Sequence, residues 1–173
     1  MKLNILSLIN GAQTKFDFDF VIESCDENPI LPPDDVIFTS PISVNGCITN
    51  TAGCMELNAN FSIDYNTHCS KCLKEISGTF EGEYFRTVVV KGTLENDNDD
   101  SYLEVSNGIV DIDRDLVEEV LVEFPFAIRC KDDCLGICQK CGVNLNKEKC
   151  SCDTKKEIDP RLAGLLKFIN NEE

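Results

Sequence analysis

Histidine and basic side chains are scarce in this sequence. His68 is the single histidine among 173 residues, and 16 lysines and arginines stand against 31 aspartates and glutamates. The resulting net charge of −15 repels nucleic-acid phosphate and attracts basic protein surfaces. One histidine also leaves little for a hydrolytic site that needs convergent acid–base groups. The sequence contains no phosphate-binding glycine loop, dinucleotide fingerprint or nucleophile elbow, so we expect no enzymatic activity and no small-molecule substrate.

Long apolar runs and export signals are also missing. No stretch of 18 apolar residues occurs, so we expect no membrane-spanning segment. Residues 1–9 are apolar, but they are too few for a signal peptide and lack a basic region and a small-residue cleavage site. We therefore expect a cytoplasmic protein whose thiols stay reduced.

Cysteine, in contrast, is abundant. The chain has 11 cysteines, an odd number that fits a disulfide framework poorly and in a reducing compartment indicates metal binding. Six of them lie within residues 130–152, a stretch with too few other apolar residues to become ordered by burial alone. Eight cysteines form close pairs: Cys69 and Cys72, Cys130 and Cys134, Cys138 and Cys141, and Cys150 and Cys152. The other three, Cys25, Cys47 and Cys54, are isolated and are expected to be free thiols.

Eight paired cysteines predict two structural zinc ions, because zinc takes four thiolates in a closed tetrahedral site. The most compact partition groups Cys138, Cys141, Cys150 and Cys152, and leaves Cys69, Cys72, Cys130 and Cys134 for a second site. In the alternative partition, one ion is bound by Cys130, Cys134, Cys138 and Cys141, with the others free. His68 could replace a thiolate beside Cys69, although a lone histidine next to a ligand is more often a surface residue. Closed four-thiolate sites leave no open position for catalysis.

Alternation of apolar and polar residues predicts several β-strands. We expect strands at residues 3–9 and 16–22 around a turn at Asn10-Gly11, and a hairpin of residues 42–48 and 55–65 around residues 50–53. A long strand with Phe80, Tyr84, Val88 and Val90 on one face and a short strand at residues 109–112 follow. Residues 25–41, which contain four prolines, are expected to form a loop.

Two helices complete the expected fold. Asp113 is expected to cap a helix that reaches Phe124 and is ended by Pro125, and Asp159-Pro160 begins a short C-terminal helix. The predicted class is α+β: a mostly antiparallel β-sheet or partly open barrel with one capped helix, a cysteine-rich zinc-binding segment and a short C-terminal helix. Residues 1–129 would form the β-rich body with its helix, and residues 130–173 the zinc-binding segment and the C-terminal helix.

The cysteine-rich part resembles the YceD family of bacterial and plastid proteins, called large ribosomal RNA subunit accumulation proteins. The shared pattern follows Phe124-Pro125 and reads Cys130-x3-Cys134-x-Gly136-x-Cys138-x2-Cys141-Gly142-x-Asn144-Leu145-Asn146, then Cys150-x-Cys152 and Ile158-Asp159-Pro160-Arg161-Leu162. Upstream, Cys69-x2-Cys72-Leu73 also matches. Lys71 stands where the family usually has arginine and Gln139 where it usually has proline, and neither change falls on an expected ligand. The resemblance covers roughly residues 40–170.

The resemblance implies a role in accumulation of the large-subunit (23S) ribosomal RNA, hence in ribosome biogenesis, and implies no known enzymatic activity. The acidic charge favours a basic ribosomal protein or assembly factor as the partner. Residues 130–152 carry four lysines against three acidic residues, so ribosomal RNA contact through the zinc-binding segment is a further possibility. Two other classes stay open at this point: an RNA-processing enzyme, and a thiol-based redox or metal switch.

Overall fold

The computed structural model describes residues 1–23, 30–33, 35–92 and 102–152. Cys25 and the C-terminal helix expected from Asp159 lie outside these described residues. The elements are β1 (Lys2–Asn4), α1 (Leu6–Ile9), β2 (Lys15–Ile22), β3 (Val36–Phe38), β4 (Ile42–Thr51), β5 (Cys54–His68), β6 (Glu75–Val90), β7 (Tyr102–Ser106), β8 (Ile109–Asp111) and α2 (Asp113–Glu123).

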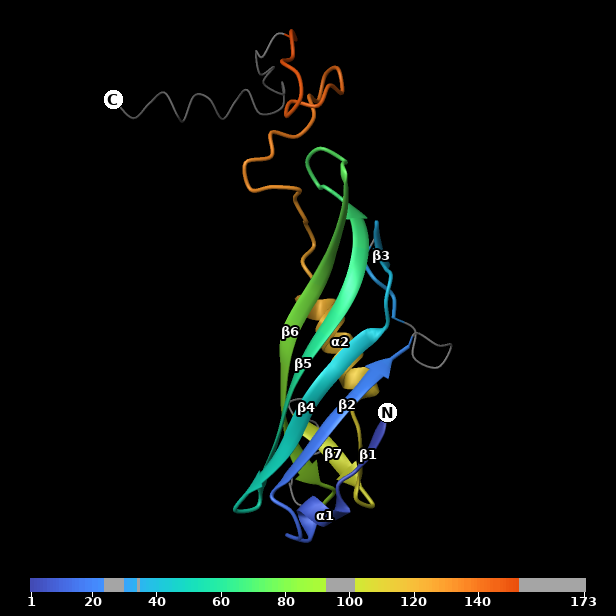
Figure 1. The fold of residues 1–173 in the computed structure, drawn as a ribbon, viewed down its shortest axis with the longest axis vertical. Coiled ribbons are helices and arrows are strands. Elements are labelled where there is room, and N and C mark those ends of the chain that lie inside the picture. The colour runs from blue at the N-terminus through green and yellow to red at the C-terminus, as the bar shows by residue number, and fades with distance from the viewer. Residues whose placement is uncertain (24–29, 34, 93–101, 153–173) are drawn as a thin grey trace, which may run out of the picture.

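The strands form one sheet in the order β1-β8-β7-β6-β5-β4-β2, and β3 pairs with β5 beyond the end of β4. The sheet curls into a half-barrel, and α2 lies against one face of it (Figure 1). Every pairing is antiparallel except that of β6 with β7. The predicted α+β class, with a mostly antiparallel sheet or partly open barrel, is confirmed.

The β4–β5 hairpin lies between β2 and β6 in the sheet and agrees with the sequence pattern. Ile42, Val44 and Ile48 are buried against the apolar positions of β5, while the intervening residues face outward. The two turn residues, Ala52 and Gly53, have φ of 54° and 94°. Positive φ at both central positions is the backbone that matches the twist of a two-residue hairpin. The expected alternation on β6 is confirmed too, since its even-numbered residues face the core.

Helix α2 ends at Glu123, shortly before the cysteine-rich segment of residues 130–152. Leu116, Val117 and Val120 are buried in the core, and Phe124 follows the helix with an extended backbone. The Phe124 ring packs edge-on against Phe38, Tyr65 and Phe80, with centroids 5.2–5.4 Å away. Pro125 then prevents the helix from continuing. This aromatic contact directs the following residues toward the turn between β5 and β6.

Two polar contacts between side chains of α2 and β6 hold the helix against this strand. The Tyr84 hydroxyl donates a 2.5 Å hydrogen bond to Asp115, and Arg86 contacts Glu119 through Nη2 at 2.6 Å. Burial and the adjacent Asp115 raise the pKa of Tyr84 well above its usual range, so the hydroxyl stays a donor. The helix is therefore held both by its apolar stripe and by this polar edge.

The N-terminal part differs from the expectation. Residues 3–9 do not form one strand: β1 ends at Asn4, whose side chain accepts a 3.1 Å hydrogen bond from the Leu6 N–H as α1 begins. Strand β1 pairs with β8, and β2 pairs with β4, so the expected pairing of the first two strands around Asn10-Gly11 is wrong. Ile5 and Leu8 are fully buried at helical spacing, and this tertiary burial outweighs the strand pattern.

Two further local predictions were wrong. Residues 25–41 contain β3, which pairs with residues 65–67 of β5. Asp113 does not cap α2, because Ile112 occupies the cap position and no side chain caps the helix. The Asp113 carboxylate instead forms an ion pair with the N-terminal amine of Met1, which β1 brings alongside β8.

Candidate metal centres

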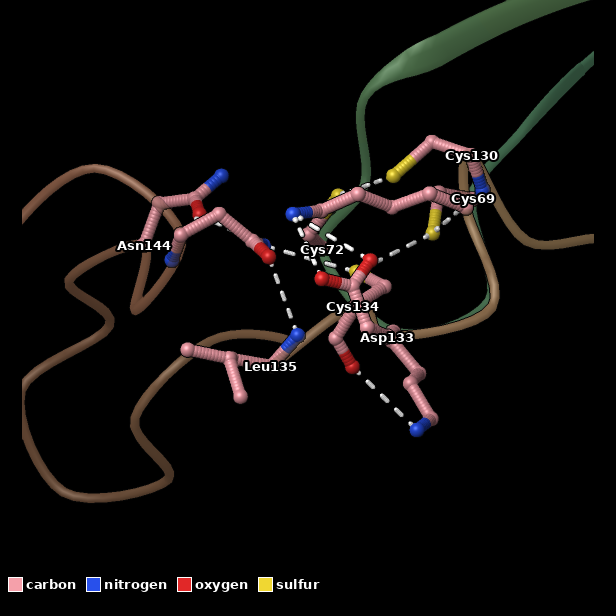
Figure 2. Close-up of polar contacts among 10 residues, drawn as sticks. Cys69, Cys72, Cys130, Asp133, Cys134, Leu135 and Asn144 are labelled. Carbon is pink, nitrogen blue, oxygen red and sulfur yellow. Dashed lines mark hydrogen bonds and ion pairs between the residues drawn. The ribbon is translucent and has the colours of Figure 1, made fainter.

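The first cysteine cluster consists of Cys69, Cys72, Cys130 and Cys134. Cys69 and Cys72 lie in the turn between β5 and β6, and the other two follow α2 (Figure 2). The sulfurs of Cys69 and Cys134 are 3.8 Å apart, and those of Cys72 and Cys130 are 3.6 Å apart. All four sulfurs lie within 4.8 Å of one another. Three of the four cysteines are buried, so this cluster belongs to the interior of the protein.

The turn that carries Cys69 exposes several N–H groups to its sulfur. The Leu73 N–H donates to the Cys69 carbonyl at 3.0 Å, and Leu73 has φ of 58°. Across the cluster, the Cys130 N–H donates to the Cys69 sulfur at 3.4 Å. Burial alone would raise the pKa of Cys69, but N–H groups of Cys130, Cys72 and Lys71 stabilise the thiolate and bring its pKa down to about 6. The backbone of this turn therefore stabilises the ionised form of Cys69.

The second cysteine cluster consists of Cys138, Cys141, Cys150 and Cys152, again with all sulfurs within 4.8 Å. Its first turn repeats the geometry of the other cluster: the Gly142 N–H donates to the Cys138 carbonyl at 2.8 Å, with φ of 75° at Gly142. Backbone N–H groups of Cys141 and Lys140 lower the pKa of Cys138 to about 6. Unlike the first cluster, none of its members is buried and Cys141 is exposed.

Both clusters fit a tetrahedral metal ion. Sulfurs placed about 2.3 Å from a zinc ion at tetrahedral corners are about 3.8 Å from each other. The contacts of 3.6 and 3.8 Å in the first cluster, and of 3.3 and 3.5 Å in the second, are close to that value. They are much longer than a disulfide bond, and all eight thiols are free. Each cluster could therefore hold a metal ion.

Two raised pKa values, one in each cluster, show why four thiols at this distance favour a cation. Burial and the neighbouring thiols raise the pKa of Cys130 to about 12. Hydrogen bonds with Cys150 and Cys141 raise the pKa of Cys152 to about 12. Once one thiolate has formed, its charge opposes ionisation of the next, and a divalent cation removes this opposition.

Asn146 contacts the first cluster from the segment that carries the second. Its side-chain nitrogen lies 3.4 Å from the Cys134 sulfur, and its side-chain oxygen accepts a 3.0 Å hydrogen bond from the Leu135 N–H. The Asn146 side-chain amide also donates a 3.0 Å hydrogen bond to the Asn144 side-chain oxygen. Residues 136–145 form the small hairpin that carries the first turn of the second cluster, with the Cys138 N–H bonded to the Val143 carbonyl at 2.8 Å. Asn146 follows this hairpin directly, so it ties the segment that carries the second cluster to a thiol of the first.

Lys71 attaches the cysteine-rich segment to the body. Its carbonyl accepts a 3.1 Å hydrogen bond from the Ile137 N–H, and its ammonium donates to the Cys134 carbonyl at 3.2 Å. Gly136 passes so close that an added Cβ would lie 3.0 Å from the Lys71 carbonyl oxygen. The roles of Lys71, Asn144 and Asn146 were not predicted. The available signal was their place in the quoted motifs, where asparagines two residues apart follow a Cys-x2-Cys-Gly turn.

The structure gathers the paired cysteines as in the more compact partition, and it does not bring Cys130 and Cys134 into one group with Cys138 and Cys141. His68 lies outside the first cluster, and its Nδ1 is 3.1 Å from an Asp35 carboxylate oxygen at the surface. Cys47 and Cys54 lie on β4 and β5, away from both clusters.

Comparison with known proteins identifies the family. The family model described as "Large ribosomal RNA subunit accumulation protein YceD" matches residues 57–169, more than half of the chain. The chain belongs to the YceD family. The matched range includes all eight clustered cysteines, β5 from Leu57 onward and all of β6, the two strands that present the first pair. No solved structure matches the chain.

Individual YceD relatives match to different extents. An uncharacterized protein of Mycobacterium tuberculosis is 28% identical over 106 residues, which cover 60% of this chain and 50% of that protein. The chain therefore spans about half the length of such mycobacterial relatives. The uncharacterized protein YlbN of Bacillus subtilis is 25% identical over all of this chain and 99% of its own length. The chloroplast YCED homolog 1 of Arabidopsis thaliana, named for large ribosomal RNA subunit accumulation, is 38% identical over 48 residues, 28% of this chain and 15% of its own.

Among the described residues, no helix is both long and apolar enough to cross a membrane.

Proposed function

We propose that this YceD-family chain is a non-enzymatic zinc-binding factor of ribosome biogenesis that supports accumulation of the large-subunit (23S) ribosomal RNA in the cytoplasm. The observation that carries the proposal is the pair of four-cysteine clusters within the region matched by the family model. In it, Cys69, Cys72, Cys130 and Cys134 bind one structural zinc ion, and Cys138, Cys141, Cys150 and Cys152 bind a second. Residues 1–129 serve as the body that presents the zinc-binding segment and C-terminal helix of residues 130–173.

A zinc ion bound in each centre would cross-link the chain segments that carry its four cysteines. Its four thiolate ligands fill the coordination shell, so neither ion keeps an open position for substrate. What the chain itself does is to hold the ligands: N–H groups around Cys69 and Cys138 stabilise thiolates, and Asn146 orients Cys134. This chemistry favours a structural role over an RNA-processing enzyme.

The partner in this proposal is a basic ribosomal protein or assembly factor. Two zinc centres with four thiolates each lower the formal net charge from −15 to about −19. Four lysines in residues 130–152 could contact ribosomal RNA, but they neutralise few phosphates. We therefore expect submicromolar binding to a lysine-rich large-subunit protein at about 0.15 M salt, and much weaker binding to naked RNA fragments. Titration of both ligands tests this, and tight binding to bare RNA with none to any basic ribosomal protein would contradict it.

The cellular experiment combines depletion with affinity capture. Depleting the protein is expected to lower large-subunit RNA relative to small-subunit RNA. Capture from growing cells, with and without ribonuclease, should retain a basic large-subunit protein after RNA is digested. Unchanged 23S RNA after complete depletion would refute the biogenesis role.

The two centres are expected to lose zinc at different rates. Cys141 is exposed, whereas Cys69, Cys72 and Cys134 are buried, so peroxide and chelators reach the second cluster first. Purified protein should contain close to two zinc ions, and mild peroxide should release about one of them well before the other, followed with a chromogenic zinc indicator. The Cys54→Ser variant, which removes an exposed thiol outside both clusters, is the control and should not change the release. Rapid loss of both ions would instead favour the thiol switch.

A further inference from the structure

The outer face of the four long strands is bare in the described part of the chain. Helix α2 and the core lie on the opposite face, as Figure 1 shows with β2, β4 and β5 in front of α2. Alternating exposure along β2, β4, β5 and β6 places every second side chain on the outer face. The register aligns these side chains in rows across the strands. One row is Asp19, Asn45, Asn60 and Glu83, and the adjacent row is Asp17, Cys47, Asn58 and Phe85.

These two rows line a shallow hollow of about 570 Å³. The middle of the hollow consists of the amides of Asn45, Asn58 and Asn60, with Cys47. Its two sides carry carboxylates: Asp19 on β2 and Glu83 on β6. Three strand spacings of about 4.8 Å separate these sides by about 14 Å. Phe85, 53% exposed, lies on the β6 side next to Glu83.

The asparagines contradict the local preference of a β-strand. Asparagine is depleted in strands because its side chain competes for backbone hydrogen bonds, yet three lie together on the two central strands. Among the described residues, no hydrogen-bond partner is found for the side-chain amides of these three asparagines. Residues that contradict the local secondary-structure preference, and gain no stabilising contact in the fold, are typical of functional surfaces. Amides can both donate to a peptide carbonyl and accept from a guanidinium.

The charge of the whole face points to a cationic ligand. Its outward side chains on the four strands include seven carboxylates, Asp17, Asp19, Glu56, Asp64, Glu75, Glu81 and Glu83. Lys15 is the single lysine or arginine among them, and it is already paired with Asp17 at 2.7 Å, while His68 at the end of β5 is paired with Asp35. A metal ion fits this face poorly, because among the described residues only the cysteines converge closely enough to bind one. An extended peptide with cationic side chains spaced along it can pair with the carboxylates on both sides of the hollow at once.

We propose that this hollow binds an extended arginine- and lysine-rich protein segment that crosses the sheet from β2 to β6. The inference rests on the proposed function, since it names the surface that takes up the basic partner. Asp19 and Glu83 pair with cationic side chains on opposite sides, the asparagines bond the peptide backbone between them, and Phe85 stacks on a guanidinium. Phosphate-bearing ligands are repelled from the same face.

A binding experiment with the full chain tests the site. The probe is a short fluorescent peptide in which arginine alternates with serine, measured by anisotropy at about 0.15 M salt. The side variant Asp19→Asn/Glu83→Gln should weaken binding about tenfold, because both charge pairs are lost. The control Glu104→Gln/Glu118→Gln changes net charge equally at exposed positions on β7 and α2, and should change binding less than about twofold. Asn58→Ala/Asn60→Ala keeps the charge and should still weaken binding several-fold.

The outcomes separate this site from the proposed function. Equal losses in the side variant and the control would show that binding follows net charge alone and would overturn the site. The same variants are then titrated with purified basic large-subunit ribosomal proteins. Equal binding of such a protein to the wild type and the side variant rejects the hollow but retains the proposed partner. Failure of every such protein to bind the wild type, with the peptide still bound in the hollow, rejects the proposed partner but retains the site.

Discussion

Replacing Cys69 by serine is expected to release residues 130–152 from the body while the sheet stays folded. Cys69 is fully buried, and its sulfur accepts the Cys130 N–H and lies beside Cys134. Loss of this ligand should remove one of two zinc ions, and with it most of the free energy that orders the segment. The sheet keeps its own core on β4, β5 and β6. Amide exchange should therefore accelerate in residues 130–137 but not in the central part of β5.

The matched variant is Cys141→Ser, which removes an exposed ligand of the second cluster. It should also cost one zinc ion, but faster exchange should be confined to residues 138–152, since the first cluster and the Lys71 contacts remain. Zinc analysis and exchange on both variants form the measurement. Loss of protection throughout the sheet after Cys69→Ser would mean that the body and the segment fold as one cooperative unit, contrary to this expectation.

Replacing Gly46 by alanine is expected to lower the free energy of unfolding by about 3 kcal/mol. Gly46 faces Ala59 across the β4–β5 pair, and an added Cβ would lie 2.4 Å from the Asn58 carbonyl oxygen and 2.6 Å from the Ala59 Cα. These are backbone atoms of the neighbouring strand, and the Ala59 Cβ at 2.6 Å is fixed to the same backbone, so no flexible side chain can move aside. Urea denaturation of the variant gives the change directly.

Gly11→Ala is the control for conformational strain without a clash. Gly11 has φ of 71°, but nothing lies within 4 Å of an added Cβ, so a cost of about 1 kcal/mol from the left-handed backbone is expected. If both variants lost the same stability, close approach of β4 and β5 at Gly46 would not be required. A larger loss of stability for Gly46→Ala than for Gly11→Ala would show that the close approach of β4 and β5 requires glycine at position 46.

Several strands could be predicted from the sequence because their pattern repeats over many residues. Residues 55–65 alternate without interruption, and burial of every odd-numbered side chain in β5 from Met55 to Ile63 follows this pattern directly. The turn at Ala52 and Gly53 was also predictable, because a two-residue hairpin requires positive φ and glycine adopts it readily. Residues 3–9 and 25–41 were predicted incorrectly because short elements such as β1, α1 and β3 depend on distant partners.

The cysteine pairs themselves are a property of the sequence. A Cys-x2-Cys step followed by a residue with positive φ presents backbone N–H groups to a thiolate, as at Cys69 and Cys138. Which pairs meet is not encoded in this local geometry. Cys72 contacts Cys130 because Phe124 ends α2 against β5 and β6, and the following residues reach the β5–β6 turn, where the Ser70 N–H donates to the Ile128 carbonyl at 2.9 Å.

The sequence by itself determined the strand-rich class, the acidic charge and the eight paired thiols, because each depends on composition or on spacing along the chain. Only the tertiary structure decided the partition into two clusters, the contact of Asn146 with Cys134, and the row that places Asp19, Asn45, Asn60 and Glu83 together. The physical reason is sequence separation. These contacts join residues that are 9 to 65 positions apart, and strand register and helix docking, rather than local preference, bring them together.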